Sequence, residues 1–285
     1  MAKMKLAYYP GCTLHGSARE YDVSTRAVCK ELGIELEEVP DWNCCGATSA
    51  HSLDSELALL LPARNLKIIE EQELNVIIPC AACFSRTKAA AYALENDDAM
   101  RSKIEADLSY KFKQKTKIYH LVELLVEEIG IDEIKKHVKN YLDGLSAVCY
   151  YGCLLVRPHE VTQLDEKENP QLLDKLMSAI GITTVDWPYK TECCGAALSL
   201  SRGKLVTKLV SSMIRWAEEA EVDAAITACP LCQANLEMRQ GEGQNFPVFY
   251  FTELLGLAFG IKEVEDSIKK HIVSVEELVR DFIKT

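Results

Sequence analysis

The cysteines of this chain fall into two copies of one pattern. Each copy has a lone cysteine, an adjacent pair followed by glycine, and a later Cys-x-x-Cys. The pair and the Cys-x-x-Cys are separated by 34 residues in both copies, and "YYPGC" and "NVIIPCAAC" match "YYGC" and "VDAAITACPLC". Such a duplication predicts two copies of one structural unit. The ten cysteines are Cys12, Cys44, Cys45, Cys80 and Cys83, then Cys153, Cys193, Cys194, Cys229 and Cys232.

The residues around these cysteines predict an α/β fold. Each cysteine group follows an expected strand, in the segments "MKLAYYP", "IELEEVP", "NVIIP", "SAVCYYG", "ITTVDWP" and "DAAITA". Helices are expected between the strands, at about 17–33, 170–181 and 203–220, and after the first pair, where leucines recur at helical spacing from Leu53 to Leu61. Alternating strands and helices predict parallel sheets, whose ligand sites lie beyond the carboxyl ends of the strands. We therefore expect the thiols of each unit to converge there.

The segment between the units sets the expected domain boundary. Residues 84–146 are mostly charged and helical in pattern, so the boundary is placed near Gly144. We expect an N-terminal domain with a helical extension over 1–144, a C-terminal domain over 145–262 and a helical tail over 263–285.

The tail and two further cysteines lie outside the repeat. Apolar tail residues recur at helical spacing, which fits a helix packed on this chain and also a docking helix for a partner subunit. These residues are Val275, Leu278, Val279 and Phe282. Cys29, on an expected helix, and Cys149, in an expected strand, are predicted to be buried small residues and not ligands.

Composition argues against several functions. The net charge is 32 − 43 = −11 without a Lys/Arg cluster, which argues against nucleic acid or an anionic lipid surface as a partner. Neither a signal-peptide pattern nor a run of about 18 apolar residues is present, so we expect a cytoplasmic chain without a membrane span. Neither a G-x-S-x-G elbow nor a P-loop motif occurs, so serine hydrolysis and nucleotide binding have no support.

Clustered cysteines in a cytoplasmic chain favour metal binding over a redox disulfide or plain core packing. Zinc or an ordinary [4Fe–4S] cubane takes four ligands, whereas each unit offers five thiols. The fifth could be free or redox-active, but its recurrence in both units favours one site that uses all five. Adjacent side chains of an extended strand point in opposite directions, so Gly46 and Gly195 are expected to permit a turn. Thiolates select zinc or iron–sulfur, which leaves both open.

The doubled pattern resembles the cysteine-rich CCG domain. The words "YYPGCTLHGSAREYD", "CCGA" and "YYGCLLVRP" are similar to those of the family formed by the B subunits of heterodisulfide reductase, and the likeness covers about residues 4–257. It implies an α/β fold of two pseudo-symmetric CCG domains. Each would be a small, mostly parallel sheet with flanking helices and a cluster site at the carboxyl ends of its strands.

The resemblance also implies cofactors, an activity and partners. Each five-cysteine set would hold one noncubane [4Fe–4S] cluster. The oxidoreductase activity implied is reduction of a disulfide to two thiols between the clusters, the disulfide being that of coenzyme M and coenzyme B in methanogenesis, or a related one. Electrons would arrive by electron transfer through the iron–sulfur C subunit of heterodisulfide reductase from its flavin-containing A subunit, with a hydrogenase or formate dehydrogenase as a further module.

Two questions stay open at this stage. An anionic disulfide would need cationic neighbours, for which Arg157, His159 and Lys208 are the candidates, with Arg202 and Lys204 beside them. No side-chain acid or base is assigned, because the clusters themselves would be catalytic. The alternatives are an electron-transfer CCG subunit of a lactate or glycolate oxidase or a thiol-dependent fumarate reductase, and an assembly module with zinc in one or both sites.

Overall fold

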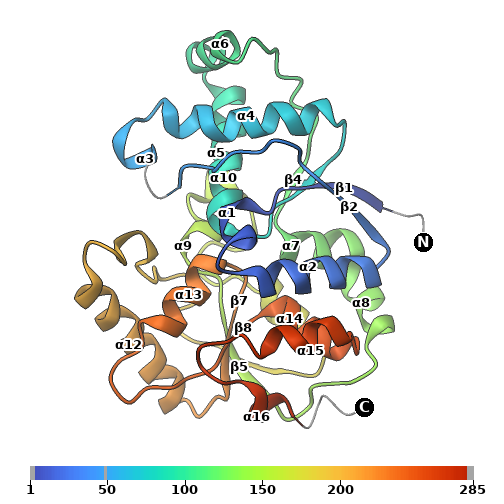
Figure 1. Cartoon of the computed structure of the whole chain (residues 1–285), viewed down its shortest axis with the longest axis vertical. Coiled ribbons are helices and arrows are strands. Elements are labelled where there is room, and N and C mark those ends of the chain that lie inside the picture. The colour runs from blue at the N-terminus through green and yellow to red at the C-terminus, as the bar shows by residue number, and fades with distance from the viewer. Residues whose placement is uncertain (1–3, 48–49, 281–285) are drawn as a thin grey trace.

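The chain forms two four-stranded sheets, one after the other along the sequence (Figure 1). The computed structural model describes residues 4–47 and 50–280. The strand orders are β2-β1-β3-β4 and β6-β5-β7-β8, and every neighbouring pair is parallel. The same order in both sheets confirms the α/β class and the duplication. The strands are β1 Met4–Tyr8, β2 Ile34–Glu38, β3 Val76–Ile77, β4 Ile118–Tyr119, β5 Ser146–Tyr150, β6 Thr183–Val185, β7 Ala224–Thr227 and β8 Val248–Tyr250.

Helices connect the strands and cover the sheets. In the first unit they are α1 Gly11–His15, α2 Arg19–Glu31, α3 Ala50–Leu53, α4 Leu57–Glu71, α5 Ala81–Asn96, α6 Asp98–Asp107, α7 Leu121–Glu123, the π-helical turn η1 Leu124–Gly130 and α8 Ile131–His137. In the second they are α9 Cys153–Val156, α10 His159–Thr162, α11 Leu172–Ser178, the 3₁₀ turn η2 Ala196–Leu198, α12 Gly203–Glu219, α13 Pro230–Met238, α14 Phe251–Ala258, α15 Lys262–Ile268 and α16 Glu276–Val279. No helix of the described residues is long and apolar enough to cross a membrane.

The helix expected from Leu53 to Leu61 is two helices. The Asp54 carboxylate accepts hydrogen bonds from the backbone amides of Glu56 and Leu57, both at 2.8 Å, in the turn between α3 and α4. Leu53 ends α3 and is 82% exposed. The leucine spacing therefore continues across a break that the side chain of Asp54 stabilises.

The repeat extends beyond the cysteines. In the first unit β4 is followed by His120, which caps α7, and Glu123 closes the capping box. In the second unit β8 ends at Tyr250, which caps α14, and Glu253 closes the equivalent box. β4 lies inside the segment expected to be mostly helical, and a strand of only two residues carries too little pattern to be predicted there.

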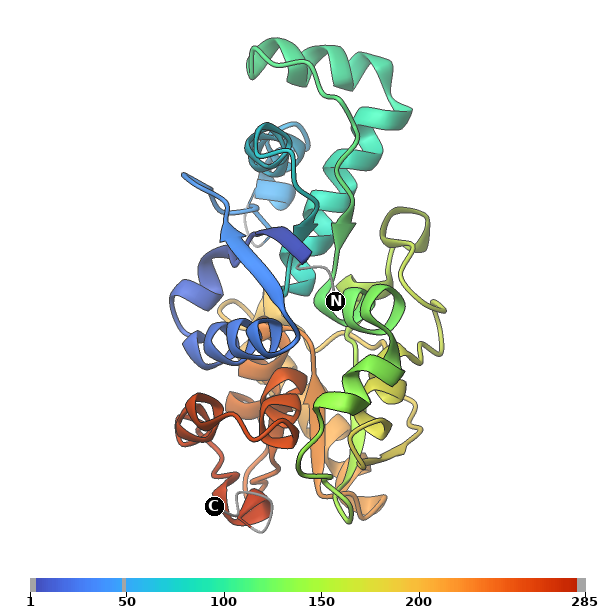
Figure 2. The same cartoon turned by 90° about the vertical axis from the view of Figure 1, so that its right-hand side faces the viewer.

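Helix α2 joins the two units. It packs against α14 and α15 of the second unit, and both views place the three helices side by side (Figures 1 and 2). The Tyr21 ring stacks on Tyr250 with centroids 4.3 Å apart, and the Ser24 and Thr252 hydroxyls are 2.6 Å apart. All four side chains are buried, so the sheets share one core. The domain boundary near Gly144 stays a prediction.

The described part of the tail packs on this chain, which agrees with the first of the two expectations for it. It forms two short helices, α15 and α16, and Val275 and Val279 are fully buried. Phe282 lies outside the described residues. The His271 imidazole is buried between Glu237 of α13 and Glu253 of α14, at 2.9 and 3.0 Å. Burial alone would lower the pKa of His271, but the charge of Glu253 and the hydrogen bond to Glu237 raise it to about 10.

Because protonated His271 stabilises the fold, the free energy of unfolding should fall as the pH rises. An unfolded histidine titrates near about 6.5, so the stabilisation is complete below that pH and is lost as pH rises toward about 10. We expect the Tm of the wild type to fall between pH 7 and 10 more steeply than that of His271→Gln, measured anaerobically by circular dichroism. The exposed His51→Gln should keep the wild-type slope; equal slopes in all three would contradict this assignment.

Candidate functional site

The cysteines lie beyond the carboxyl ends of the strands in both units, as predicted. Cys12, the pair at 44–45 and Cys80 follow β1, β2 and β3, and their counterparts follow β5, β6 and β7. The Cys45 and Cys83 Sγ atoms are 3.3 Å apart, and those of Cys194 and Cys232 are 3.7 Å apart. The same thiols thus meet in each unit. Among the described residues, no three His, Cys, Asp or Glu side chains are arranged as around a single metal ion.

The second sulfur of each adjacent pair faces the last thiol of the Cys-x-x-Cys in its unit. The neighbouring thiols of Cys44 and then Cys83 lower the pKa of Cys45 to about 3, and the neighbouring Cys153 thiol lowers the pKa of Cys193 to about 6. The turn that allows this has positive φ at Gly46 (75°) and Gly195 (77°). Each glycine amide donates to the first sulfur of its pair, at 3.4 and 3.3 Å. Glycine is expected here because φ is positive.

The Cys-x-x-Cys sulfurs lie at helix N-termini. Cys80 caps α5 and Cys229 caps α13, so Cys83 and Cys232 lie in the first turns. The thiols of Cys232 and Cys80, followed by two backbone amides of α13, hold the pKa of Cys229 well below its usual range. Helix N-termini favour negative charge, whereas the neighbouring thiols and burial raise the pKa of Cys83 and Cys232 well above the usual value.

Each site has an exposed rim and a buried floor. Cys12, Cys44 and Cys193 are exposed and Cys153 is half-buried. The other six cysteines of the repeat are buried. The floors adjoin, because the Tyr21 hydroxyl donates both to the Pro79 carbonyl, directly before Cys80, and to the Ala228 carbonyl, directly before Cys229. The two five-thiol sets therefore share a midline between the units.

Two buried side chains of the first unit bridge this midline. The Tyr21 hydroxyl donates to the Pro79 and Ala228 carbonyls at 3.1 and 3.3 Å, and His120 Nε2 lies 2.8 and 3.2 Å from the same oxygens. Carbonyls only accept, so Nε2 carries the proton; burial lowers the pKa of His120 to about 4 and keeps the ring neutral. These carbonyls directly precede Cys80 and Cys229. Neither Tyr21 nor His120 was identified from the sequence. For His120 the available signal was that it and Tyr250 occupy equivalent helix-capping positions in the two units.

One tyrosine per unit supports the adjacent cysteine pair. The Tyr9 hydroxyl donates to the Asn43 carbonyl at 2.9 Å, and the Tyr150 hydroxyl donates to the Glu192 carbonyl at 2.6 Å. Each carbonyl directly precedes a pair. A tyrosine of the repeated Tyr-Tyr dipeptide therefore links the end of the strand to the cysteine turn in both units.

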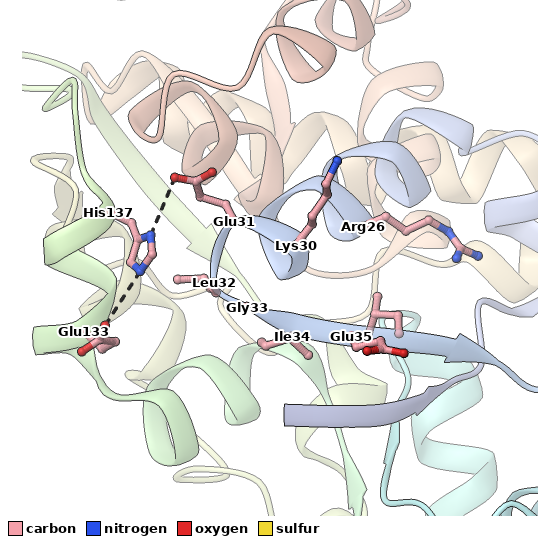
Figure 3. Close-up of a pocket in the computed structure, with 10 residues that line it drawn as sticks. Arg26, Lys30, Glu31, Leu32, Gly33, Ile34, Glu35, Glu133 and His137 are labelled. Atoms are coloured by element: carbon pink, nitrogen blue, oxygen red, sulfur yellow. Dashed lines mark ion pairs between the residues drawn. The ribbon is translucent and has the colours of Figure 1, made fainter. Parts of the chain in front are cut away.

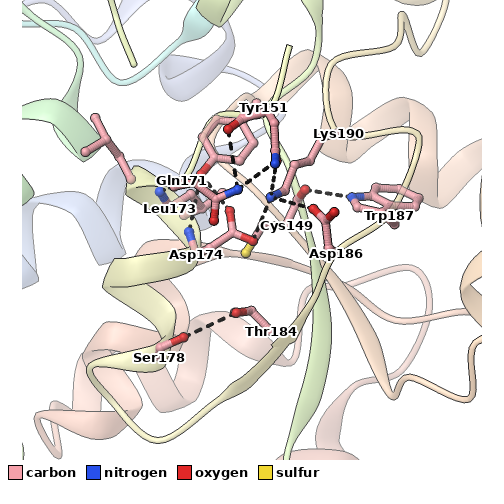
Figure 4. A network of polar contacts seen from close by, with 12 residues as sticks. Cys149, Tyr151, Gln171, Leu173, Asp174, Ser178, Thr184, Asp186, Trp187 and Lys190 are labelled. Carbon is pink, nitrogen blue, oxygen red and sulfur yellow. Dashed lines mark hydrogen bonds and ion pairs between the residues drawn. The ribbon is translucent and has the colours of Figure 1, made fainter. Parts of the chain in front are cut away.

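A buried lysine is specific to the second unit (Figure 4). Lys190 is 3% exposed, and its Nζ lies 3.2 Å from Asp174 Oδ1 and 3.0 Å from Asp186 Oδ1. Its carbonyl accepts the amides of Tyr151 and Gly152 at 2.9 and 3.1 Å. Lys190 thus connects the turn that carries Cys153 to the loop that carries Cys193.

The site fits an iron–sulfur cluster by its donors and its clearance. Thiolates and backbone N–H donors are the groups that bind and tune such clusters. A Cβ on Gly11 would lie 2.8 Å from Cys83 Sγ, and one on Gly152 would lie 3.0 Å from Cys232 Sγ. The chain therefore keeps side chains away from these sulfurs. Ligation by the ten cysteines stays a prediction.

The predicted substrate contacts do not form one group. Arg157, at the end of α9, pairs with Glu168 at 2.6 Å and donates to Thr191, and the exposed His159 contacts the Asp165 carbonyl. Lys208 is exposed on α12. His15 pairs with Glu38 at 3.0 Å. Cys29 and Cys149 are fully buried, as expected, and burial raises the pKa of Cys29 to about 12.

A separate pocket lies away from the cysteines (Figure 3). Its volume is about 670 Å³, between α2, β2 and α8, and His137 lies 3.7 Å from Glu31 and 3.8 Å from Glu133 beside it. No cysteine lines it. We therefore centre the candidate site on the two thiol sets.

Comparison with known proteins agrees with the duplication. The family described as "Cysteine-rich domain" (CCG) matches residues 6–87 and again 147–237, together more than half of the chain. A solved structure of a hypothetical protein from Helicobacter pylori has a TM-score of 0.75 at 12% identity, over 96% of this chain and 53% of that chain. That likeness concerns the fold alone.

Curated relatives match nearly end to end and are subunits of oxidoreductases. The 8-methylmenaquinol:fumarate reductase membrane anchor subunit of Wolinella succinogenes is 29% identical, over 96% of this chain and 99% of the relative. The B subunit of the ferredoxin/F420H2-dependent CoB–CoM heterodisulfide reductase of Methanosarcina acetivorans is 27% identical, over 98% and 97%. A protein of Archaeoglobus profundus, named as similar to the B subunit of heterodisulfide reductase, is 27% identical, over 90% and 91%.

Substitution of Gly11 should empty one site. Gly11→Ala places a Cβ 2.8 Å from Cys83 Sγ, so we expect roughly half of the wild-type iron and sulfide after anaerobic reconstitution. Gly33→Ala is the matched control, because φ is +73° there against +72° at Gly11 and nothing lies within 4 Å of its Cβ. Both variants bear the same backbone strain, about 1–2 kcal/mol, because an L-residue with a Cβ is disfavoured at positive φ. Full iron in Gly11→Ala would contradict this placement.

Proposed function

The chain belongs to the cysteine-rich CCG domain family, and on that basis we propose that it is the disulfide-reducing iron–sulfur subunit of a heterodisulfide reductase-type complex. Its substrate is a small-molecule disulfide, either that of coenzyme M and coenzyme B or a related one. Its partners are an iron–sulfur C subunit and a flavin-containing A subunit, with a hydrogenase or formate dehydrogenase module as a further electron source. Two observations carry the proposal: equivalent thiols meet within each unit, and the carbonyls before Cys80 and Cys229 share the Tyr21 hydroxyl.

The ten cysteines of the repeat are the proposed ligands of two noncubane [4Fe–4S] clusters, one per unit. Such clusters would supply single electrons and bind sulfur. One disulfide, two electrons and two protons give two thiols, so one electron from each site completes the reaction. The exposed rims at Cys12, Cys44 and Cys193 leave each site open to solvent, which provides the protons.

The residues of the chain hold the two sites in a fixed relation. Tyr21 and His120 together make four hydrogen bonds to the carbonyls before Cys80 and Cys229, and all are buried. A substrate whose two sulfurs are joined by one bond needs two acceptors at a fixed separation, because positioning supplies a large part of catalysis. We propose this bridge as the device that sets the separation.

Arg157 and His159 remain proposed contacts for an anionic part of the substrate. The Arg157–Glu168 pair is partly exposed, and such pairs contribute only about 0–1 kcal/mol, so a substrate anion can replace the glutamate. Lys208 lies on the outer face of α12, and a different role is proposed for it below.

A second function has one specific observation in its favour. The Wolinella fumarate reductase subunit matches this chain at 29% identity along nearly its whole length. An electron-transfer subunit of a fumarate reductase complex would use the same cysteines to pass electrons and would bind no disulfide. Zinc in one or both sites is a third arrangement, which metal analysis distinguishes from iron.

The proposed activity is tested by spectroscopy of the anaerobic holoprotein before and after addition of the coenzyme M–coenzyme B disulfide. We expect four irons per site without zinc, a new paramagnetic signal on addition of the disulfide, and its loss in Cys44→Ser. Cys29→Ser is the control, because Cys29 is buried outside both sites. A cluster signal that the disulfide leaves unchanged would favour the electron-transfer function, and stoichiometric zinc would exclude a cluster from at least one site.

The bridge gives a separate prediction. Tyr21→Phe removes two of the four midline hydrogen bonds and keeps the ring that stacks on Tyr250. We expect unchanged iron content, a loss of about 1–2 kcal/mol of stability and a weaker magnetic interaction between the two reduced clusters, measured by electron paramagnetic resonance. Tyr110→Phe loses a hydroxyl bonded to Glu70 far from the midline and should keep the wild-type spectrum. If the magnetic interaction between the clusters were unchanged in Tyr21→Phe, the hydrogen bonds of Tyr21 would not set the separation of the two sites.

A further inference from the structure

The segment after the second cysteine pair is chemically unlike the rest of the chain. Residues 193–217 contain no Asp or Glu, although the chain has 43 acidic residues. The same segment carries Arg202, Lys204, Lys208 and Arg215. Spread over 14 positions, these cations do not form a run in the sequence, and helix α12 brings them together.

Exposed apolar side chains gather on the same segment. Of the eleven large apolar side chains that are exposed in the described residues, four lie between residues 198 and 209. Leu200 is 100% exposed, and Leu205 and Leu209 lie one turn apart on α12. Soluble proteins seldom expose neighbouring apolar groups without a partner for them. We call the surface formed by residues 198–209 and Arg215 the α12 face.

The cations of the α12 face have no acidic partner within the described chain. Lys204, Lys208 and Arg215 follow one another at i, i+4 and i+11, which places them on one side of the helix beside the stripe of Leu205 and Leu209. All three cations are exposed and none makes an ion pair with a described residue. An apolar centre flanked by unpaired charge of one sign is the composition of a protein-binding surface.

The α12 face lies directly outside the second thiol set. A Cβ on Gly195 would lie 3.2 Å from a Val206 methyl and 3.4 Å from a Leu209 methyl, so the first turns of α12 pack on the cysteine turn itself. Cys193, two residues before Gly195, is exposed. A protein bound on this face is therefore separated from the second site by little more than α12 and its turn.

The corresponding surface of the first unit carries acidic residues, one of which, Glu56, pairs with Lys103 at 2.5 Å. Leu53 and Leu57 are exposed after the first pair, but the acidic residues Asp54 and Glu56 lie between them. The two sites thus differ in what can approach them, although their cysteines are equivalent. An acidic partner would therefore meet unpaired cations beside the second site and carboxylates beside the first.

We propose that the α12 face binds an acidic one-electron carrier protein, so that electrons enter the chain at the site of Cys153, Cys193, Cys194, Cys229 and Cys232. This rests on the proposed function, in which both sites hold redox clusters, and it gives the carrier the role of immediate electron donor that the C subunit has there. Each encounter oxidises one reduced carrier and passes one electron to the second site, and two encounters supply one disulfide. An anionic lipid surface would contact the same cations and leucines but would deliver no electron. Because the α12 face lies beside a redox site, an electron carrier is the partner that we assign to it.

The test measures reduction of the anaerobic holoprotein by a reduced acidic [2Fe–2S] ferredoxin in a stopped-flow instrument at low salt. Electrostatic steering changes association rates by about 10–1,000-fold. The double variant Lys204→Glu with Lys208→Glu should therefore lower the second-order rate constant at least about tenfold and weaken its salt dependence. Reduction by dithionite should keep its wild-type rate. Leu200→Ser should raise the ferredoxin concentration that gives half-saturation.

Two controls isolate the α12 face. Lys115→Glu with Lys175→Glu changes the net charge equally at exposed positions elsewhere, and Leu53→Ser removes the exposed leucine of the first unit. Both should behave as the wild type. The proposal is wrong if the Lys204–Lys208 variant matches the charge control, or if dithionite reduction slows by the same factor. It is also wrong if these lysines govern sedimentation with phosphatidylglycerol vesicles and leave the ferredoxin rate unchanged. No disulfide enters the assay, so its result is independent of the substrate assignment.

Discussion

The hydrogen bonds that Tyr21 and His120 make to two carbonyls are the constraint on which the rest of the site depends. The carbonyls belong to different units, and each precedes the first cysteine of a Cys-x-x-Cys. Because both carbonyls are buried, each needs a hydrogen-bond donor. A carbonyl left unpaired there would cost about 1–3 kcal/mol. The helices that begin at Cys80 and Cys229 then fix the direction of the remaining thiols, and α2, which carries Tyr21, also packs on α14 and α15.

The sequence predicts the parts of this arrangement that recur within it. Ten equivalent cysteines, their strands and most of their helices follow from the duplication, because periodic apolar residues and repeated spacings are visible without a structure. The pairing of Cys45 with Cys83 and of Cys194 with Cys232 agrees with that prediction. The glycine turns were also predictable, since a Cys-Cys-Gly needs a backbone that aims both sulfurs inward.

The features that the sequence does not reveal are those that differ between the copies. His120 and Tyr250 cap equivalent helices, yet only His120 reaches both carbonyls, and this depends on how the two sheets pack. Lys190 has no counterpart among the buried residues of the first unit's cysteine turn. The cations of α12 look scattered along the chain and align only on the helix. Contacts between distant segments carry no periodicity, so they could not be read from local pattern.

The position of His271 bears on the order in which the protein can be completed during synthesis. Its imidazole holds Glu237 of α13 and Glu253 of α14, and α13 begins at Cys229. The first five cysteines are therefore translated before the segment that secures the second set. The second half of the site thus depends on a residue that follows all ten cysteines of the repeat.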